Sequence, residues 1–365
     1  MNSEDAGGGE KPSNGKSSKP RDSKGWDGKL RVERRPLIVN PEALSDPDYS
    51  DEDAPPPELI EADEDLLDGV EEDTEEVDLV HCRITSIPAL HLERFQKVQR
   101  LCLRQNQITI VELPQEWAST STLQDIDLYD NLLKHIEGLD SLLELISLDL
   151  SFNKIKHIKN VNHLTKLKDL YFVQNKIQNI EGLEGLSNLR NLELAGNRLR
   201  TIENLESLKG LEELWLGKNK ITEIKNIDSL SNLRILSIQS NRLTQISGLS
   251  SLTSLEELYI SHNALTNISG LESNTSLRVL DVSNNPIDHF TGLTNNSNLE
   301  EVWASNCLFG DFAEVERELK DKEKLDTVYF EGNPLQKNQP VLYRNKIRLA
   351  LPQVKQIDAT YVKVS

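Results

Sequence analysis

Acidic and aromatic side chains recur at one position of a repeated sequence pattern, four residues before the asparagine or cysteine that closes each repeat. Five of the eleven residues at this position are aromatic and four are carboxylates, although aromatic residues make up only 5% of the chain. Rings supply apolar contact area and carboxylates supply charge, which together favour protein recognition. The position is occupied, in order, by Cys102, Asp127, Asp149, Tyr171, Glu193, Trp215, Ser237, Tyr259, Asp281, Trp303 and Tyr329.

The closing residues are spaced 22 residues apart from Asn131 to Cys307. They end the pattern L-x-x-L-x-L-x-x-N, seen in Leu145, Leu148, Leu150 and Asn153, which is typical of a leucine-rich repeat. We count twelve repeats, with irregular spacing only at the two ends. The chain is therefore predicted to form a solenoid, in which each repeat buries its apolar groups against its neighbours.

The elements that position the recurring acids and rings follow from this pattern. The L-x-L segment of each repeat is expected to be a short strand whose leucines point into the core and whose intervening residue points to the other side. The closing Asn both donates and accepts hydrogen bonds, so it is expected to link backbone groups of neighbouring repeats. The predicted fold class is an α/β leucine-rich-repeat solenoid, a curved right-handed arc with a parallel β-sheet on its concave face and a C-terminal helical cap.

We predict that the concave face is a groove that binds another protein. Exposed strand positions favour aromatic residues in general, and charges keep a sheet soluble, but these effects explain single residues and not a whole column. Twelve strands about 4.8 Å apart make a groove on the order of 55 Å long, which is enough for a folded protein. Further acids lie two residues earlier in the repeats, at Asp125, Asp169, Glu213, Glu257 and Glu301.

Charge restricts the partner. The chain has a net charge of −19, and residues 46–78 hold 17 acidic residues without a Lys or Arg, so the repeats themselves are only mildly acidic. Carboxylates along the groove repel phosphate, which disfavours nucleic acid and favours a basic or mixed protein surface.

Four regions are expected. Residues 1–45 are predicted to be a disordered tail, and residues 46–76 an acidic low-complexity segment, read either as a solvated linker or as a short helix that folds against a basic partner. The solenoid is predicted at 77–333 and its C-terminal cap at 334–365. In the cap, one face of a helix ended by Pro352 is expected to carry Tyr343, Ile347, Leu349 and Leu351.

Motifs for other functions are missing from the sequence. It has no Gly-rich phosphate loop, no G-x-S-x-G and no H-E-x-x-H, and its three cysteines show no paired spacing. We therefore expect a protein that is not an enzyme and that needs no metal or cofactor. No apolar run approaches the roughly 18 residues of a membrane span, so a soluble intracellular protein is expected.

Several stretches resemble the leucine-rich-repeat regulatory subunits of protein phosphatase 1. They include LCLRQNQI, LDLYDN, LGKNKIT and the ending LPQVKQIDATYV, and the likeness covers roughly Val77 to Val364. The resemblance implies a non-catalytic subunit that binds the catalytic subunit of protein phosphatase 1 and controls its maturation, localisation or activity. It further implies residence in the nucleus and also the cytoplasm, and a ternary complex with a small phosphatase inhibitor protein. Apart from its partner, the chain is expected to be a monomer.

The resemblance also implies which groove residues touch the phosphatase. Tyr171 and Trp215 stand where Phe is expected, so the ring is kept while its polar edge changes. Tyr259 is added because of its place in the column. A short basic-Val-x-aromatic docking peptide is absent from the sequence, so binding is expected to depend on the folded groove. The positions that match the family are Asp149, Tyr171, Glu193, Trp215, Asp281, Glu301, Trp303 and Tyr329.

Two other classes of function stay open from the sequence. One is a nuclear leucine-rich-repeat scaffold of a ribonucleoprotein, which the acidic groove disfavours. The other is a scaffold of the histone-chaperone type, whose members carry a long acidic tail after few repeats. In this chain the acidic block is shorter and precedes twelve repeats.

Overall fold

The computed structural model describes residues 66–362, and the structural statements below concern these residues. The predicted disordered tail at 1–45 and residues 46–65 of the predicted acidic segment lie outside them.

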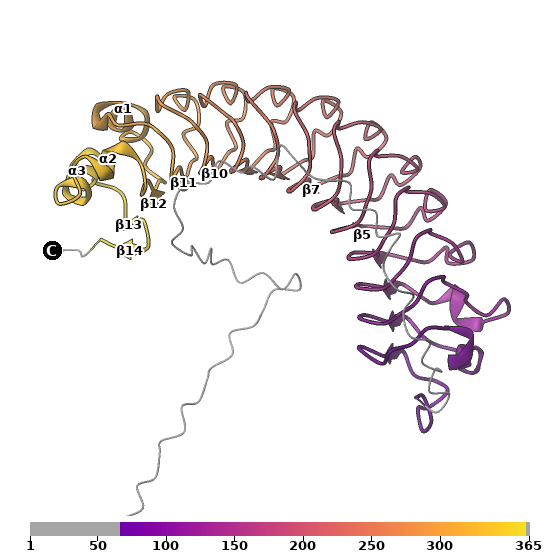
Figure 1. The fold of residues 1–365 in the computed structure, drawn as a ribbon. Coiled ribbons are helices and arrows are strands. Elements are labelled where there is room, and N and C mark those ends of the chain that lie inside the picture. Colours follow the sequence, from indigo (N-terminus) through magenta and orange to yellow (C-terminus); the bar gives the residue numbers. More distant parts are fainter. Residues whose placement is uncertain (1–65, 363–365) are drawn as a thin grey trace, which may run out of the picture. The chain divides into compact units, whose positions relative to one another are not determined.

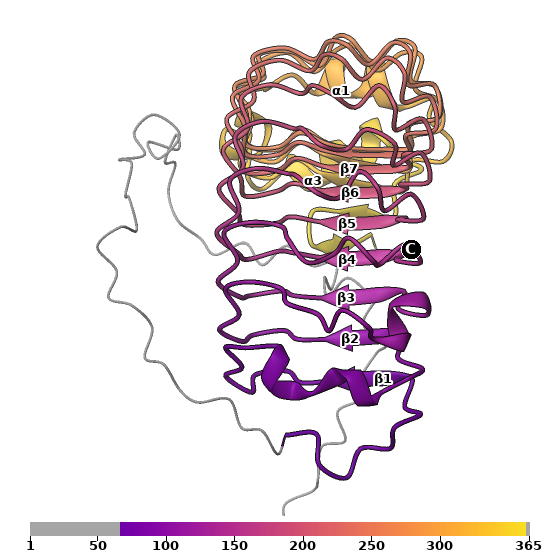
Figure 2. The same cartoon turned by 90° about the vertical axis from the view of Figure 1, so that its right-hand side faces the viewer.

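One three-residue strand per repeat builds a continuous sheet in which β1 to β13 run parallel, each beside the next in sequence. Figure 1 shows the strands along the inner side of the repeats, and Figure 2 shows β1 to β7 stacked in one direction. The repeat strands are β1 (Glu76–Asp78), β2 (Arg100–Cys102), β3 (Asp125–Asp127), β4 (Ser147–Asp149), β5 (Asp169–Tyr171), β6 (Asn191–Glu193), β7 (Glu213–Trp215), β8 (Ile235–Ser237), β9 (Glu257–Tyr259), β10 (Val279–Asp281), β11 (Glu301–Trp303) and β12 (Thr327–Tyr329).

The core lies between the sheet and the outer turns. The middle residue of each strand points inward, and Leu148, Leu170 and Leu192 are fully buried. Apolar residues of the outer turns, such as Ile155 and Leu164, meet them from the other side and are equally buried. The outer segments are mostly irregular turns, with short 3-10 helices at Pro88–Leu90, Leu92–Arg94 and Ala118–Ser121. The predicted leucine-rich-repeat solenoid of about twelve repeats is thus confirmed, with few helices.

The closing asparagines join the repeats, as their chemistry predicts. The Asn153 side-chain amide donates to the carbonyl oxygens of Leu128 at 2.9 Å and Leu150 at 3.1 Å, and its oxygen accepts from the Leu133 backbone N–H at 2.9 Å. These bonds satisfy buried backbone groups in two successive repeats. Cys307 makes weaker contacts of the same kind, from its thiol to the carbonyl oxygens of Val282 at 3.4 Å and Ser305 at 3.7 Å.

The packed region begins before the first strand. Leu67 is buried against the core, and the backbone carbonyl groups of Glu72 and Glu75 accept hydrogen bonds from Gln96 and Gln99. The last part of the acidic segment therefore packs on the first repeat, on the N-terminal side of the expected solenoid boundary at 77.

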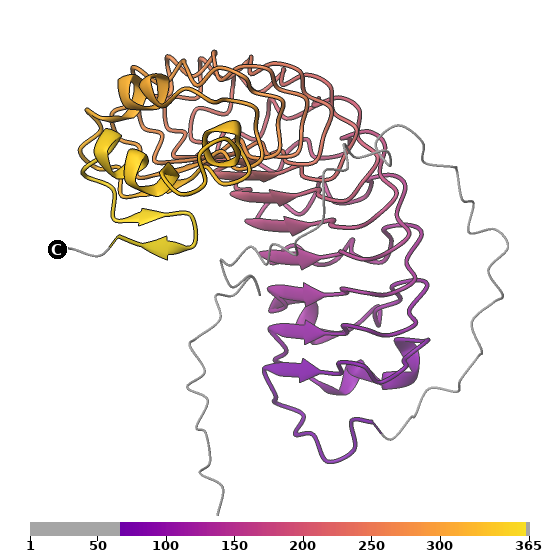
Figure 3. The same cartoon turned by 60° about the vertical axis from the view of Figure 1, so that its left-hand side comes forward.

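The helix α1 (Phe312–Leu319) lies in the outer segment between β11 and β12. The C-terminal cap is made of the helices α2 (Pro334–Lys337) and α3 (Tyr343–Ala350) and the strands β13 (Gln356–Ile357) and β14 (Thr360–Tyr361). β13 pairs with β12, and β14 turns back on β13, as the yellow hairpin in Figure 3 shows. The Asp358 carboxylate accepts from the backbone N–H groups of Phe330 and Glu331 and from the Tyr343 hydroxyl. The cap thereby extends and ties down the last edge of the repeat sheet.

One prediction for the cap is wrong. Tyr343, Ile347 and Leu351 are buried as expected, but Leu349 is 82% exposed. Successive helix residues turn by about 100°, so position 349 lies away from the face that carries 343 and 347, and Ala350 takes its place in the core. Within residues 66–362, no helix has the length and apolar character that crossing a membrane requires.

Candidate protein-binding site on the concave sheet

All nine candidate residues lie on the concave side of the sheet. Eight are the third residue of their strands and Glu301 is a first residue, so they point away from the core into which the middle residues pack. The register places like positions beside one another, for example Asp149 beside Tyr171 and Trp303 beside Tyr329. All are half-buried except Asp281, which is 6% exposed.

Four of the candidates form one continuous row of rings, which we call the ring row: Trp215, Tyr259, Trp303 and Tyr329. The centroids of Trp215 and Tyr259 are 6.4 Å apart with nearly parallel planes, and those of Tyr259 and Trp303 are 6.2 Å apart. Trp303 meets Tyr329 edge to face at 5.9 Å. Such ring pairs are favourable beyond their buried area, so the row is a connected apolar surface.

Short side chains between the rings make this contact possible. Residues two strands apart stand roughly 9.6 Å from each other, well beyond the observed ring separations. Ser237 lies between Trp215 and Tyr259, and Asp281 lies between Tyr259 and Trp303. Because Ser237 and Asp281 are short and buried, the rings lean over them toward one another.

Glutamates hold the polar edges of three rings. Each stands two residues before its ring on the same strand, and both side chains share the concave face because side chains alternate. The Nε1 of Trp303 donates to Glu301 at 3.0 Å, and that of Trp215 donates to Glu213 at 3.2 Å. The Tyr259 hydroxyl donates to Glu257 at 2.8 Å. These bonds fix the rings, which lowers the entropy lost when a partner binds.

Burial sets the protonation behaviour of this surface. It raises the pKa of Glu301 above its ordinary value, against the opposing effect of the hydrogen bond from Trp303. Burial also raises the pKa of Tyr259, and the nearby Glu257 carboxylate raises it further. The tyrosine is therefore a neutral hydrogen-bond donor over the physiological pH range.

Tyr171 is separated from the ring row by Glu193. Glu193 stands between Tyr171 and Trp215 in the register. The Tyr171 hydroxyl accepts from the Asn191 amide at 3.3 Å, and burial raises its pKa. The structure therefore gives Tyr171 a polar partner on the next strand.

The two aspartates among the candidates have a structural task. Asp149 and Asp281 each accept a hydrogen bond from the backbone N–H two residues later, Ser151 at 2.8 Å and Ser283 at 3.0 Å. Burial raises the pKa of both carboxyl groups, and these hydrogen bonds only partly oppose it. The carboxylates of Asp149 and Asp281 thus stabilise the turns at the ends of their strands and also contribute to the charge of the groove.

Sequence reasoning missed a cluster at the first repeats, which we call the N-terminal rim: Arg104, Tyr129 and Phe152. The Arg104 guanidinium bonds to Asp127 at 2.8 Å, lies 3.9 Å from Asp149, and stacks on the Tyr129 ring with its carbon 4.0 Å from the centroid. Phe152 packs on Tyr129 with centroids 4.7 Å apart. Arg104 and Tyr129 stand two residues after the ends of β2 and β3, and Phe152 stands three residues after the end of β4, so the column of third strand positions does not include them.

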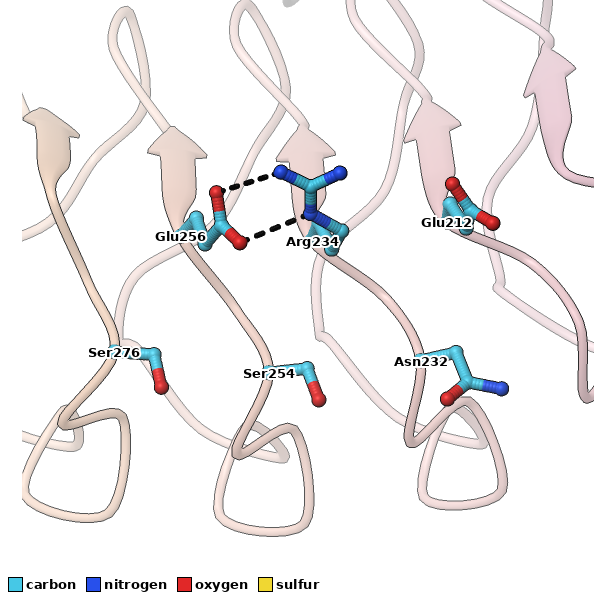
Figure 4. A pocket seen from close by; sticks show the side chains of 6 residues that line it. All are labelled: Glu212, Asn232, Arg234, Ser254, Glu256 and Ser276. Atoms are coloured by element: carbon cyan, nitrogen blue, oxygen red, sulfur yellow. Dashed lines mark hydrogen bonds and ion pairs between the residues drawn. The ribbon is translucent and has the colours of Figure 1, made fainter.

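A ladder of alternating charges borders the ring row on the side where the strands begin. Arg234 pairs with Glu256 through two bonds of 2.9 Å, as Figure 4 shows, and Arg278 pairs with Glu300 in the same way. A depression of about 460 Å³ lies here, lined by Glu212, Asn232, Arg234, Ser254, Glu256 and Ser276. All six lining residues are polar or charged, whereas small-molecule sites are lined mainly by apolar residues.

Groups for metal or thiol chemistry are not gathered on this part of the chain. Among residues 66–362, no group of three His, Cys, Asp or Glu side chains is placed to hold a metal ion. The cysteines are free, and burial raises the pKa of Cys102 to about 11 and that of Cys307 to about 12, which keeps both thiols protonated.

Comparisons with known proteins agree with the fold. The family model for leucine-rich repeats (2 copies) matches in five overlapping windows between residues 165 and 295. An internalin from Listeria monocytogenes is 22% identical with a TM-score of 0.63, covering 79% of this chain and 87% of its own. A leucine-rich-repeat protein of Leptospira interrogans is 24% identical with a TM-score of 0.57, covering 73% of each chain. These likenesses define a leucine-rich-repeat protein and show the fold alone.

Curated relatives are more specific. Protein phosphatase 1 regulatory subunit SDS22 of Schizosaccharomyces pombe is 70% identical over 311 residues, which are 85% of this chain and 92% of that protein. Protein phosphatase 1 regulatory subunit 7 of Mus musculus is 61% identical over a stretch of 46 residues, 13% of this chain and 12% of that protein. The chain belongs to the SDS22 family of protein phosphatase 1 regulatory subunits.

Proposed function

We propose that this chain is a non-catalytic regulatory subunit that binds the catalytic subunit of protein phosphatase 1 through the concave sheet. The names of its relatives support the partner. The ring row is the observation that carries the site, because it presents connected aromatic area on the side of the sheet that faces away from the core. Tryptophan and tyrosine dominate the binding energy of many protein interfaces.

The glutamates add selectivity to this surface. Glu213, Glu257 and Glu301 each stand beside a ring and bring negative charge to its edge. A partner surface that carries Arg or Lys beside apolar side chains complements both features, since cations interact favourably with carboxylates and with ring faces. Such a surface fits this groove better than a phosphate backbone does, which supports a protein partner over a ribonucleoprotein scaffold.

The test is co-purification of the phosphatase catalytic subunit with Trp303→Ala and, separately, with Glu301→Ala. Trp303 is half-buried within the row, and truncation to Ala removes its contacts with Tyr259 and Tyr329. We expect both variants to lose the phosphatase while circular dichroism shows a folded solenoid. Leu349→Ala is the control, because it removes an exposed apolar side chain from α3 in the cap. Undiminished binding by both groove variants would refute the site.

Finer parts of the proposal concern the complex and its place in the cell. We propose that the chain controls the maturation, localisation or activity of the phosphatase, that it is a monomer apart from its partner, and that a small inhibitor protein joins a ternary complex. Its expected sites are the nucleus and also the cytoplasm. Light scattering on the purified chain alone tests whether it is a monomer. Imaging of a tagged full-length chain tests whether it resides in the nucleus and the cytoplasm.

A further inference from the structure

One turn position differs from its equivalents in the other repeats. The residue before each closing Asn or Cys has a positive φ, from Gln105 at 54° to Asn306 at 55°. Most of these residues are small or polar, as a left-handed conformation favours. Apart from Phe152, the residues at this position in these repeats are Gln105, Asp130, Gln174, Gly196, Lys218, Ser240, His262, Asn284 and Asn306. Phe152 holds the same conformation with a φ of 56°, yet it is bulky, apolar and 40% exposed.

The fold does not require a ring at this position. Gln174 and Ser240 form the same turn with nearly the same φ in other repeats. The position of Tyr129, two residues before the closing Asn, is likewise filled by Ser151 and Ala195 in later repeats. Phe152 thus exposes apolar area that its repeat does not need for folding, and it does so at a position that breaks the local pattern. Such exposed apolar area indicates a surface for binding a partner.

A contact inside the N-terminal rim indicates which chemical group its aromatic rings bind. A guanidinium, that of Arg104, already stacks on Tyr129 at 4.0 Å. Carboxylates surround the stack, since Asp127 and Asp149 lie 2.8 and 3.9 Å from Arg104 and Asp130 follows Tyr129 in the chain. Phe152 adjoins this stack through its contact with Tyr129, and its exposed side offers a partner's cation an aromatic face of the same kind.

We infer that the N-terminal rim is a second contact surface for the phosphatase catalytic subunit, at which Phe152 and Tyr129 receive an arginine or lysine side chain. This inference rests on the proposed function. The rim adjoins the groove through Asp127 and Asp149, which Arg104 bridges to the rings. A folded partner that lies along the groove and reaches its first repeats would meet the rim at the same time.

The experiment measures the dissociation constant of the purified phosphatase catalytic subunit for the full chain and its variants by biolayer interferometry. Phe152→Gln installs the residue that two other repeats use in this turn, and Tyr129→Ser installs the residue of the next repeat. We expect the double variant to bind about tenfold more weakly. Gln174→Ala changes the same turn position one repeat later and is expected to leave the affinity unchanged.

A third variant tests the chemistry of the contact. Phe152→Leu keeps much of the apolar area but removes the aromatic face, so it should also weaken binding if a cation is received there. Full affinity of Phe152→Leu would overturn the cationic contact, and full affinity of the double variant would overturn the rim altogether. If the unaltered chain fails to bind the phosphatase, the proposed function itself fails, which separates the two results.

Discussion

The two halves of the concave sheet use acidic and aromatic residues in opposite ways. In β2 to β4 and the turns that follow them, the carboxylates of Asp127 and Asp149 face a guanidinium, and the rings of the N-terminal rim stand beside the column. In β7 to β12 the rings occupy the column itself and the glutamates hold their edges. The same residue types therefore give a largely self-paired acidic region and a pre-arranged apolar row.

This difference suggests a division of tasks. Fixed rings bury apolar area with little loss of conformational freedom, so the second half should supply most of the affinity. Paired acids contribute less net energy but shape the field that a basic partner meets on approach. We expect variants of the two halves to separate along these lines.

The largest expected effect is on affinity for the phosphatase catalytic subunit. Trp303→Ala should weaken binding about 100-fold, because a central ring of an interface typically contributes two or more kcal/mol. Asp149→Asn should weaken it less than about tenfold and act mainly on the association rate, since it changes charge but not shape. Surface plasmon resonance at two salt concentrations resolves both. Equal losses for the two variants would remove the proposed division.

Removing the positive charge of Arg104, in the first half of the concave sheet, should lower the stability of the chain. Arg104→Met leaves Asp127 without its 2.8 Å partner, although that carboxylate is only 8% exposed. An unpaired charge at such a site should lower the free energy of unfolding by about 1–2 kcal/mol. Denaturant titration measures this change. If the variant is as stable as the unaltered chain, the hydrogen bonding of the Asp127 carboxylate within its own turn is sufficient without Arg104.

A smaller effect is expected from a glutamate of the second half. Glu257→Gln keeps an acceptor for the Tyr259 hydroxyl but removes the charge. Phosphatase binding should weaken about threefold, as expected for the change from a charge-assisted to a neutral hydrogen bond. Calorimetric titration beside Glu272→Gln, an exposed acid in an outer turn, provides the matched comparison. An affinity loss as large as that of Trp303→Ala would mean that Glu257 binds the partner directly.

The smallest effect concerns pH. Burial raises the pKa of Asp281 above its ordinary value of 3.8, so the folded chain binds this proton more tightly than the unfolded chain does. Ionised Asp281 therefore costs stability at neutral pH, and the cost fades as pH falls through the raised pKa toward 3.8. Asp281→Asn should raise the Tm by about 2 °C at neutral pH.

This gain should shrink in acid, because the native carboxyl group is then already neutral. Differential scanning fluorimetry over a pH series measures the difference between the two chains. A gain that grows on acidification would contradict the assigned direction of the pKa shift.

Local pattern was enough to predict the repeat strands and the asparagine links. Leu148 and Asn153 obey rules that act within one repeat, so spacing alone places them. The column of concave residues followed for the same reason. The sheet register then brought Trp303 beside Tyr329, as the equal strand positions required.

Contacts between repeats were harder to predict. Nothing in the spacing indicated that Trp215 and Tyr259 would lean together over Ser237, because that depends on side-chain direction in three strands. The N-terminal rim was missed because Tyr129 and Phe152 stand outside the column, although comparing turn residues across repeats would have singled out Phe152. Leu349 was misplaced because apolar character alone does not fix a helix face.

Side-chain footprinting with hydroxyl radicals tests the central claim most directly, because it reports the exposure of individual rings. The chain is labelled alone and in the presence of the phosphatase catalytic subunit, and modification is read by mass spectrometry. We predict that Trp215, Tyr259 and Trp303 become protected, while Tyr361, which is 75% exposed in the cap hairpin, reacts as before. Unchanged reactivity of all three groove rings in the bound complex would contradict the ring row as the binding surface.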